Sequence, residues 1–308
     1  LVRDPRRYRP GLTSWLPIAK ERYVGQLRAC LELAIRSLPE LHQSHARHTF
    51  EQFVTRVDQD AALRGFSARQ VEGMAFELIR RVSGRRWPLD ELKQRWHDAA
   101  IPALPELWKD VQSQPTEDAR LRRAIELAVA GNQFGFEEFL KVQDPARPID
   151  FLTLTSAPIP FESTQDHFED VWQRLASSGR KERILYVLDN VGEEVVDLVL
   201  IRLLLQQGHE VIVVAHGEEA ANDTTVRDLQ RLFRDPRVWR FSAEGKVRLP
   251  KVIESGSTTR GTDLRTVSAA LQKEGSRATL IIAKGEGNRG TLRGVTRDLV
   301  NTTLQVPF

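Results

Sequence analysis

The chain has 308 residues, 41% of them hydrophobic and 28% charged, and a formal net charge of +3. This composition is typical of a soluble globular protein, and the length exceeds that of one ordinary core, so we expect two domains. The positive charge is mild and no basic run alternates with aromatic residues, which argues against nucleic-acid binding, and no apolar run is long enough to span a bilayer.

Two further features concern the compartment. The start of the chain, Leu1–Arg7, lacks the apolar core of a signal peptide. Cys30 is the single cysteine, so an internal disulfide framework is excluded and a reducing compartment fits. We therefore expect a cytoplasmic location.

The first part of the chain has a helical pattern from about Lys20 to Ser177. Apolar residues recur there at helical spacing, and prolines separate the segments. One helix is expected to begin after Thr116 and to end at Gly131-Asn132. We therefore predict a helical domain over residues 1–178.

Three histidines in this part, His42, His45 and His48, are evenly spaced and could share one face of a helix. A structural three-histidine zinc site usually gathers ligands from distant segments. A solvated helix face is therefore the preferred interpretation, with a metal site as the alternative.

Beyond about residue 179 the pattern changes to short apolar runs that alternate with helical segments. This alternation predicts an α/β fold over residues 179–308, with βαβ units, a mainly parallel sheet and a three-layer αβα sandwich. The expected strands are Ile184–Leu188, Val211–Ala215, Val238–Phe241, Lys251–Glu254 and Thr279–Ala283. The expected helices are Glu193–Gln207, Thr224–Phe233 and Leu264–Lys273.

The first of these strands ends in Asp189 and Asn190, and Val191-Gly192 follow at once. Ligands bind at the carboxyl ends of the strands in an open α/β sheet. An aspartate beside an asparagine offers the hard oxygen ligands that Mg²⁺ or Mn²⁺ prefer. The pair therefore predicts a metal site. The alternative is that the two residues only cap the following helix.

A second pair of this kind, Asn222-Asp223, follows the next expected strand and precedes the helix expected from Thr224. One capping residue is enough for a helix, so two leave one residue for another role. Asp223 would complete a metal site of three protein oxygens, with positions left for water and substrate.

Two glycine-rich segments follow later strands. The loop that contains Gly256 and Thr262 offers backbone N–H groups that can surround an anion, although an ordinary flexible loop has the same composition. Gly285–Gly290 matches the G-x-G-x-x-G pattern but lacks the further strand with an acidic end that a dinucleotide fold requires. We interpret it as a phosphate-binding turn with Lys284 at its entrance, suited to hold a phosphoryl oxygen.

Two other phosphotransfer chemistries are excluded. Asp189-Asn190-Val191 lacks the second aspartate that haloacid-dehalogenase-type phosphatases use for proton transfer. The chain has no G-x-x-x-x-G-K-[ST] element, so it is not a P-loop NTPase.

Several segments share their order and spacing with a known family. They are Ala128-Val-Ala-Gly-Asn132, Leu188-Asp-Asn-Val-Gly-Glu-Glu-Val-Val-Asp197, Ala221-Asn-Asp-Thr-Thr-Val-Arg-Asp228, Val252-Ile-Glu-Ser-Gly256 with Gly261-Thr262, and Ala283-Lys-Gly-Glu-Gly-Asn288. On these segments the chain resembles the ARMT-like damage-control phosphatase family, from roughly Leu121 to Asn288.

The resemblance implies a helical domain joined to a Rossmann-like αβα domain. It also implies metal-dependent hydrolysis of phosphate monoesters of small metabolites, often sugar phosphates, in a cleft between the domains. By resemblance, Asp189, Asn190 and Asp223 would hold the divalent ion, Mn²⁺ or Mg²⁺, with Co²⁺ or Ni²⁺ as alternatives. Lys284 and Asn288 would face the substrate phosphate.

We assign catalytic roles to Asp189 and Lys284. The sequence does not assign the general base: Asp189 is the nearest candidate, but a carboxylate bound to a metal is a poor base, and Glu193 is an alternative. Lys284 and the Gly285–Asn288 backbone would offset charge on the transferring group, with Arg289 as a further candidate. The residues expected to bind the substrate are Asn132, Glu193, Gly256, Thr262, Gly285, Asn288 and Arg289.

The chain departs from the family pattern at two places. Arg289-Gly290 follow Asn288 where an aromatic and an acidic residue are usual, and Gly135 takes a usually acidic position. These departures keep two alternatives open. One is a transferase or lyase on the same metal-binding scaffold, and the other is a non-catalytic metabolite-binding protein.

Overall fold

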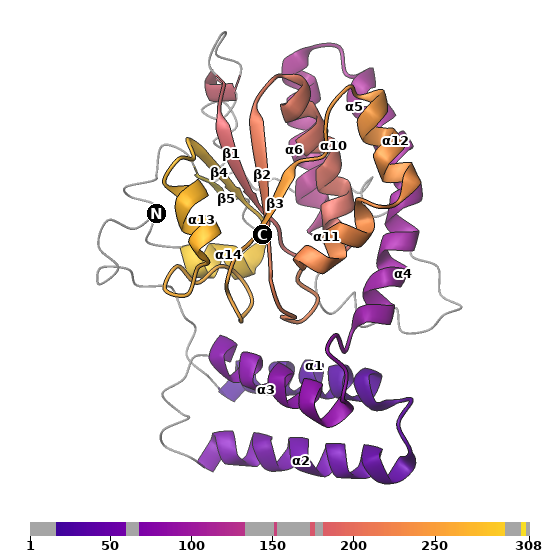
Figure 1. The fold of residues 1–308 in the computed structure, drawn as a ribbon, viewed down its shortest axis with the longest axis vertical. Helices are drawn as coiled ribbons and strands as arrows, with labels where there is room; N and C mark the ends of the chain where they lie inside the picture. The colour runs from indigo at the N-terminus through magenta and orange to yellow at the C-terminus, as the bar shows by residue number, and fades with distance from the viewer. Residues whose placement is uncertain are drawn as a thin grey trace.

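The structure, a computed structural model, describes residues 17–59, 68–132, 151–152, 173–175, 181–292 and 303–305 (Figure 1). Its first part is helical, as predicted. Thr116 caps the last helix of this part, because its Oγ1 accepts a hydrogen bond of 3.1 Å from the Ala119 N–H. The helices are α1 (Pro17–Ile35), α2 (Glu40–Gln59), α3 (Ala68–Ser83), α4 (Asp90–Ala100), α5 (Leu104–Ser113) and α6 (Glu117–Gly131), with a 3₁₀ turn at Ile101–Ala103.

From Arg183 onward strands alternate with helices, so the predicted α/β class is confirmed. The strands are β1 (Arg183–Val187), β2 (Glu210–Ala215), β3 (Lys251–Glu254), β4 (Leu280–Ala283) and β5 (Thr303–Gln305). The helices are α10 (Glu193–Gln206), α11 (Val226–Leu232), α12 (Pro236–Glu244), α13 (Ala269–Gly275) and α14 (Gly285–Leu292).

The described strands form one parallel sheet in the order β3-β2-β1-β4-β5. β1 lies at its centre, with Leu185 opposite Ile212 of β2 and Ile281 of β4. From β1 the chain first builds the sheet towards β3 and then returns to add β4 on the other side. The carboxyl ends of β1 and β4 therefore form the switch point at which open α/β sheets bind ligands.

One predicted strand is wrong. Val238–Phe241 lies inside helix α12, which begins at the helix-start signal Asp235-Pro236. Asp235 accepts a hydrogen bond of 2.8 Å from the Arg237 N–H, and Pro236 takes a position where its missing N–H is not needed. Val238 and Phe241 are three residues apart, so both reach the core from one helix face.

A predicted helix begins later than expected. The segment from Leu264 is non-helical until Ser268, whose side chain accepts a hydrogen bond of 3.0 Å from the Leu271 N–H and starts α13. The glycine-rich segment after β4 also differs from the expected turn, because Gly285 already opens helix α14.

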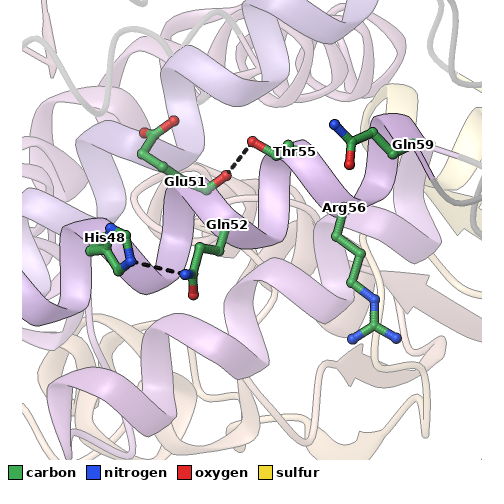
Figure 2. Close-up of a pocket in the computed structure, with 6 residues that line it drawn as sticks. All are labelled: His48, Glu51, Gln52, Thr55, Arg56 and Gln59. Atoms are coloured by element: carbon green, nitrogen blue, oxygen red, sulfur yellow. Dashed lines mark hydrogen bonds between the residues drawn. The ribbon is translucent and has the colours of Figure 1, made fainter.

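The surface of the outer helix α2 carries the three histidines. His42, His45 and His48 are exposed, and within the described residues no group of three or more His, Cys, Asp or Glu side chains is arranged to hold a metal ion. Among the described helices, none has both the length and the apolar character that crossing a bilayer requires. A hollow of about 540 Å³ lies on this helix, lined by His48, Glu51, Gln52, Thr55, Arg56 and Gln59, whose side chains are drawn in Figure 2.

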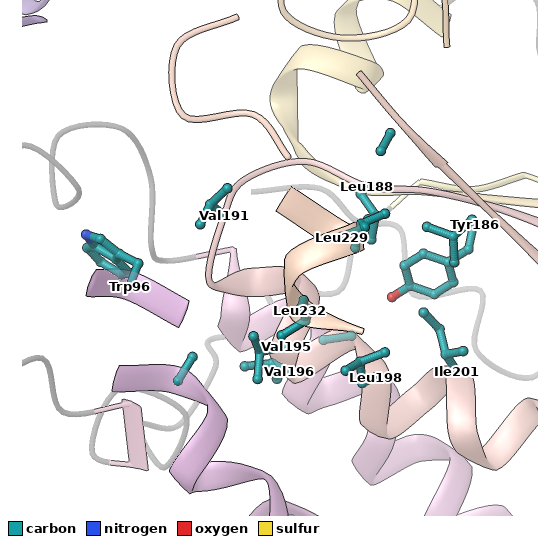
Figure 3. Packing of buried hydrophobic residues seen from close by; sticks show 14 of the residues in the cluster. Trp96, Tyr186, Leu188, Val191, Val195, Val196, Leu198, Ile201, Leu229 and Leu232 are labelled. Atoms are coloured by element: carbon teal, nitrogen blue, oxygen red, sulfur yellow. The ribbon is translucent and has the colours of Figure 1, made fainter. Parts of the chain in front are cut away.

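Helices and buried side chains cover both faces of the sheet. Tyr186 and Leu188 belong to a large cluster with residues of α10, α11 and the first, helical part (Figure 3). Leu185 and Val187 belong to a smaller cluster on the opposite face, with Leu271 of α13. This alternation along β1 confirms the predicted three-layer sandwich.

The helical part joins the sheet mainly through α10, against which α4, α5 and α6 pack. Gly131 of α6 lies directly against α10, since a Cβ there would be in van der Waals contact with the Cβ of Val196 at 3.5 Å. The large buried cluster extends from α1 to α12. The predicted domain boundary between residues 178 and 179 falls outside the described residues.

Two aromatic rings pack against the turn after β1. Trp96 of α4 and Phe151 meet edge to face with ring centroids 5.5 Å apart. Gly192 lies against them with a φ of 99°, and a Cβ at this position would lie 3.0 Å from an atom of each ring. The helical part therefore fixes the path of the chain just after Asp189 and Asn190.

We expect Gly192→Ala to lower the free energy of unfolding by about 2–4 kcal/mol, from backbone strain and displaced rings together. Urea unfolding measures the change. Gly25→Ala is the matched control: Gly25 is exposed in α1 with no atom within 4 Å of the added carbon, so alanine there should be neutral or stabilising. Equal stability of Gly192→Ala and the wild type would contradict this account.

Candidate metal and phosphate site

The segments that follow β1 and β2 come together at the carboxyl edge of the sheet. Asn190 and Asp223 form an isolated antiparallel bridge. The Thr224 N–H donates to the Asp189 carbonyl at 2.7 Å, and the Val191 N–H donates to the Asn222 carbonyl at 2.9 Å. The structure thus brings together the three residues that the sequence proposes as metal ligands.

Neither pair of residues caps the helix that follows it. The N-cap of α10 is Gly192, without a side-chain cap. The N-cap of α11 is Thr225, which forms a capping box with Asp228. The capping alternative for Asp189-Asn190 and for Asn222-Asp223 is therefore excluded. Both residues of the second pair are buried, with Asp223 2% exposed and Asn222 0% exposed.

Two carboxylates meet in this buried place. Burial, followed by the charge of Asp223, raises the pKa of Asp189 to about 7. Like charges at a site with little water are unfavourable unless a cation or a proton compensates them. The site therefore has the electrostatic character of a cation site.

The amide of Asn190 is oriented by its neighbours. Its nitrogen donates to Asp189 Oδ2 at 2.8 Å and to Glu193 Oε1 at 2.7 Å. Two carboxylates thus hold the amide nitrogen, and the amide oxygen is the group that remains for a cation. Asp189, Asn190 and Asp223 provide a donor set of hard oxygens that fits a divalent ion such as Mg²⁺ or Mn²⁺.

His216, which the sequence analysis did not single out, orients Asp223. Its Nε2 lies 3.1 Å from Asp223 Oδ2, and its Nδ1 lies 3.3 Å from the Ser257 carbonyl oxygen. The Gly261 N–H donates to the same Asp223 oxygen at 3.4 Å. The sequence contained one signal that could have identified His216, namely its position directly after the end of β2.

Lys284 lies between carboxylates of α10. Its fully buried Nζ is 2.9 Å from Asp197 Oδ1 and 3.2 Å from Glu193 Oε2, and the Tyr186 hydroxyl donates to the same Asp197 oxygen at 2.8 Å. Burial alone lowers the pKa of Lys284, but Asp197 and Glu193 outweigh burial and raise it. Lys284 is therefore a fixed cation beneath the site.

Asn132 reaches the site from the end of α6, as the sequence predicts. In the amide orientation that satisfies its surroundings, its nitrogen donates to Asp189 Oδ2 at 3.3 Å and to Glu193 Oε2 at 3.0 Å. Glu193 thus receives hydrogen bonds from Asn132, Asn190 and Lys284. Burial raises the pKa of Glu193 well above its usual range.

Glycines occur in the site where neighbouring side chains or backbone leave no room for a Cβ atom. Gly285 has a φ of 81°, and a Cβ there would lie 1.8 Å from Asp189 Oδ2. Gly261 has a φ of 74°, and its Cβ would lie 2.3 Å from the Gly287 carbonyl oxygen. Gly256, with a φ of 80°, lies against the backbone of residues 266–268 instead.

Thr262 and Asn288 tie these segments to each other. The Thr262 hydroxyl donates to Asn288 Oδ1 at 2.9 Å. The Asn288 amide nitrogen donates to the carbonyl oxygens of Leu188 and Lys284, both at 2.9 Å. In this arrangement Asn288 holds the start of α14 against the end of β1. The side chain of Arg289 and residue Gly135 lie outside the described part of the chain.

The chain matches the model of a known protein family. The family model of the damage-control phosphatase ARMT1-like domain matches residues 18–303. The chain belongs to this family.

Two archaeal relatives show how far the similarity extends. Damage-control phosphatase PH1575 of Pyrococcus horikoshii is 31% identical over 171 residues, 55% of this chain and 52% of that protein. The uncharacterized protein MJ0202 of Methanocaldococcus jannaschii is 27% identical over 214 residues, 70% of this chain and 64% of that protein. The chain therefore spans between about half and two thirds of these relatives.

A longer relative and a solved structure are also similar to this chain. Pantothenate kinase 2 of Arabidopsis thaliana is 27% identical over 228 residues, 64% of this chain but only 25% of that protein. The crystal structure of a DUF89 family protein from Pyrococcus horikoshii has a TM-score of 0.63 and 22% identity, with 90% of this chain and 86% of that chain covered. The structural similarity confirms the fold.

Lys93 connects the candidate site to the helical part. It lies on α4 and is fully buried, and its Nζ donates to the Asp223 carbonyl at 2.9 Å and lies 3.1 Å from both Asp228 Oδ2 and Glu219 Oε2. Burial alone lowers the pKa of Lys93, but Asp228 and Glu219 outweigh burial and raise it. A lysine so distant in the sequence gives no signal in a reading of local patterns.

We expect Lys93→Met to lower the free energy of unfolding by about 3–5 kcal/mol, because it leaves Glu219 and Asp228 buried without their cation. Lys109→Met is the control, since Lys109 is an exposed lysine whose ion pair with Glu106 should contribute less than about 1 kcal/mol. Urea unfolding of both variants checks this expectation. Similar losses in the two variants would contradict it.

We expect Gly285→Ala to weaken Mn²⁺ binding at least about tenfold, because the added carbon displaces the Asp189 carboxylate. Isothermal titration calorimetry of metal-free protein measures the affinity. Gly84→Ala is the matched control: Gly84 also has a positive φ, 65°, but no atom lies within 4 Å of the added carbon. If both variants bind Mn²⁺ like the wild type, Asp189 does not hold the ion.

Proposed function

We propose that this protein is a metal-dependent phosphatase that hydrolyses phosphate monoesters of small metabolites, of the sugar-phosphate kind, at the carboxyl edge of its sheet. Membership of the damage-control phosphatase family supports the reaction class. The observation that carries the proposal is the convergence of Asp189, Asn190 and Asp223, a buried set of hard oxygens with excess negative charge.

In this proposal Asp189, Asn190 and Asp223 hold a divalent ion, with Mn²⁺ or Mg²⁺ preferred and Co²⁺ or Ni²⁺ as alternatives. When bound there, such an ion would supply Lewis-acid chemistry, polarising a phosphoryl oxygen and making a water molecule more acidic. His216 and Gly261 hold one oxygen of Asp223, so that its carboxylate keeps a fixed orientation.

The buried residues behind the ligands keep the site in place. Asn132 and Asn190 position the carboxylates of Asp189 and Glu193 by donating to both. Lys284 offsets the charge of Asp197 and Glu193, and it stabilises the ionised form of Asp189 from behind. A preorganised set of charges of this kind needs little rearrangement when charge develops on a transferring phosphoryl group.

A panel of phosphate esters, with Mg²⁺, Mn²⁺, Co²⁺ and Ni²⁺ in turn, tests the proposal. We expect release of inorganic phosphate that a chelator abolishes and the metal restores. Asp223→Ala should lower kcat/KM at least about 100-fold, since even the partners of metal ligands typically contribute about 10- to 100-fold. Asp235→Ala is the control, because Asp235 caps α12 at the surface and does not belong to the site.

Three results would contradict the proposal. Full activity of Asp223→Ala would remove that residue from the ligand set. Turnover of a phosphorylated compound without release of inorganic phosphate would favour a transferase or a lyase. Metal-dependent stabilisation of the fold without cleavage of any ester would favour a binding protein.

A further inference from the structure

A hollow of about 560 Å³ lies where the end of α1, the start of α4 and helix α11 meet. Small-molecule sites commonly occupy about 300–1,000 Å³. Positive charge dominates its lining, which includes the four arginines Arg36, Arg85, Arg95 and Arg231 but only the two carboxylates Asp90 and Glu91. The candidate metal ligands are all within the described part of the chain, and none of them belongs to this lining.

Asp90, at the start of α4, is shared by two arginines of α11. Its Oδ1 accepts a hydrogen bond of 2.8 Å from Nη1 of Arg227, and its Oδ2 accepts one of 2.8 Å from Nη2 of Arg231. Both arginine side chains are about one-third exposed, at 34% and 30%. One carboxylate offsets only one of the two positive charges, so this side of the hollow keeps a net positive charge.

Glu91 is shared in the same way on the other side of the hollow. It forms an ion pair with Arg36, and its Oε1 lies 3.4 Å from Nη1 of Arg85. Nη2 of Arg85 donates to Ser37 Oγ at 2.6 Å, which holds this guanidinium in place. A guanidinium has five N–H donors, so an arginine held at one corner keeps donors for a further acceptor.

The lining combines this charge with apolar surface. The buried Leu89 and Leu92 of α4 belong to it, beside the arginines. Arginine forks bind phosphate groups in a bidentate manner, and a phosphate monoester carries up to about two negative charges near neutral pH. An excess of two arginines over carboxylates therefore matches the phosphate, and the leucines match an apolar organic group attached to it.

We propose that this hollow binds a small organic phosphate at a place separate from the candidate metal site. The inference goes beyond the proposed function, because it requires neither a metal ion nor hydrolysis. The rival interpretation is that the shared carboxylates only fasten α1, α4 and α11 to one another.

Calorimetric titration of phenyl phosphate into the full, metal-free chain, with a chelator present, tests the proposal. We expect saturable binding of one molecule per chain. Inorganic phosphate should bind more weakly, because it lacks an apolar part, and added salt should weaken the binding of both.

Substitutions on both sides of the hollow separate the two interpretations. We expect Arg85→Gln and Arg231→Gln each to weaken phenyl phosphate binding at least about tenfold, as loss of a charge-assisted hydrogen bond does. Glu91→Gln should instead bind phenyl phosphate about two- to fivefold more tightly, because Arg36 and Arg85 lose the carboxylate that competes for them. A fastening role alone predicts no gain in affinity.

Arg28→Gln is the matched control, since Arg28 forms an exposed ion pair of 2.7 Å with Glu51 away from the hollow. It should bind phenyl phosphate like the wild type. Thermal unfolding of every variant reports any loss of folded protein. Asp223→Ala should also bind phenyl phosphate like the wild type, because the candidate metal site takes no part.

Three results would overturn the inference. The first is that phenyl phosphate does not bind to the metal-free wild type. The second is equal affinity of Arg85→Gln, Arg231→Gln and the wild type, which would leave the arginines as fastening residues. The third is loss of binding in Asp223→Ala, which would place the phosphate at the metal site. None of these measurements involves ester cleavage, so the hollow and the phosphatase function can fail independently.

Discussion

The close approach of Asp189 and Asp223 is the constraint on which the rest of the site depends. Backbone hydrogen bonds from Thr224 to Asp189 and from Val191 to Asn222 fix the two segments. The backbones of the two residues therefore stay close together unless these bonds break. Burial removes the water that would otherwise screen their carboxylates. The surroundings must supply positive charge, and the residues around the pair are arranged accordingly.

Part of this support comes from outside the sheet. Lys93 donates to the Asp223 backbone from α4, and Asn132 donates to Asp189 from the end of α6. Trp96 and Phe151 lie against Gly192 and leave no room for a side chain in the turn after β1. The helical part thus packs directly against the turns that carry the candidate ligands. This packing explains why the large buried cluster includes residues of both parts of the chain.

The sequence predicted those features that depend on local patterns. The apolar run before Asp189 identifies a buried strand, and parallel strands place the residues after β1 and β2 at one edge. That geometry requires no knowledge of side-chain partners, so Asp189, Asn190 and Asp223 were found together. Val238–Phe241 was assigned wrongly, because a short apolar run with aromatic residues has similar spacing in a helix and a strand. The Asp235-Pro236 start signal distinguishes the two.

Long-range partners could not be predicted in the same way. Lys93 is 130 residues from Asp223 in the chain, and nothing in its own helix distinguishes it from a solvated lysine. Lys284 was correctly placed at a strand end, but its engagement with Asp197 and Glu193 follows from the position of α10 against the sheet. Burial and partner identity are properties of the assembled core, so a single sequence contains them only implicitly.

The position of Lys284 also affects how a phosphate ester would be bound. Its charge already offsets Asp197 and Glu193 behind the ligands, so little of it remains for an arriving dianion. The cation held by Asp189 and Asp223 would then provide most of the attraction. Gly261 joins the loop after β3 to Asp223, so a cation held by Asp223 would lie close to this loop. Without the cation, two carboxylates would repel the incoming anion, so the ion would have to be in place for the phosphate to bind.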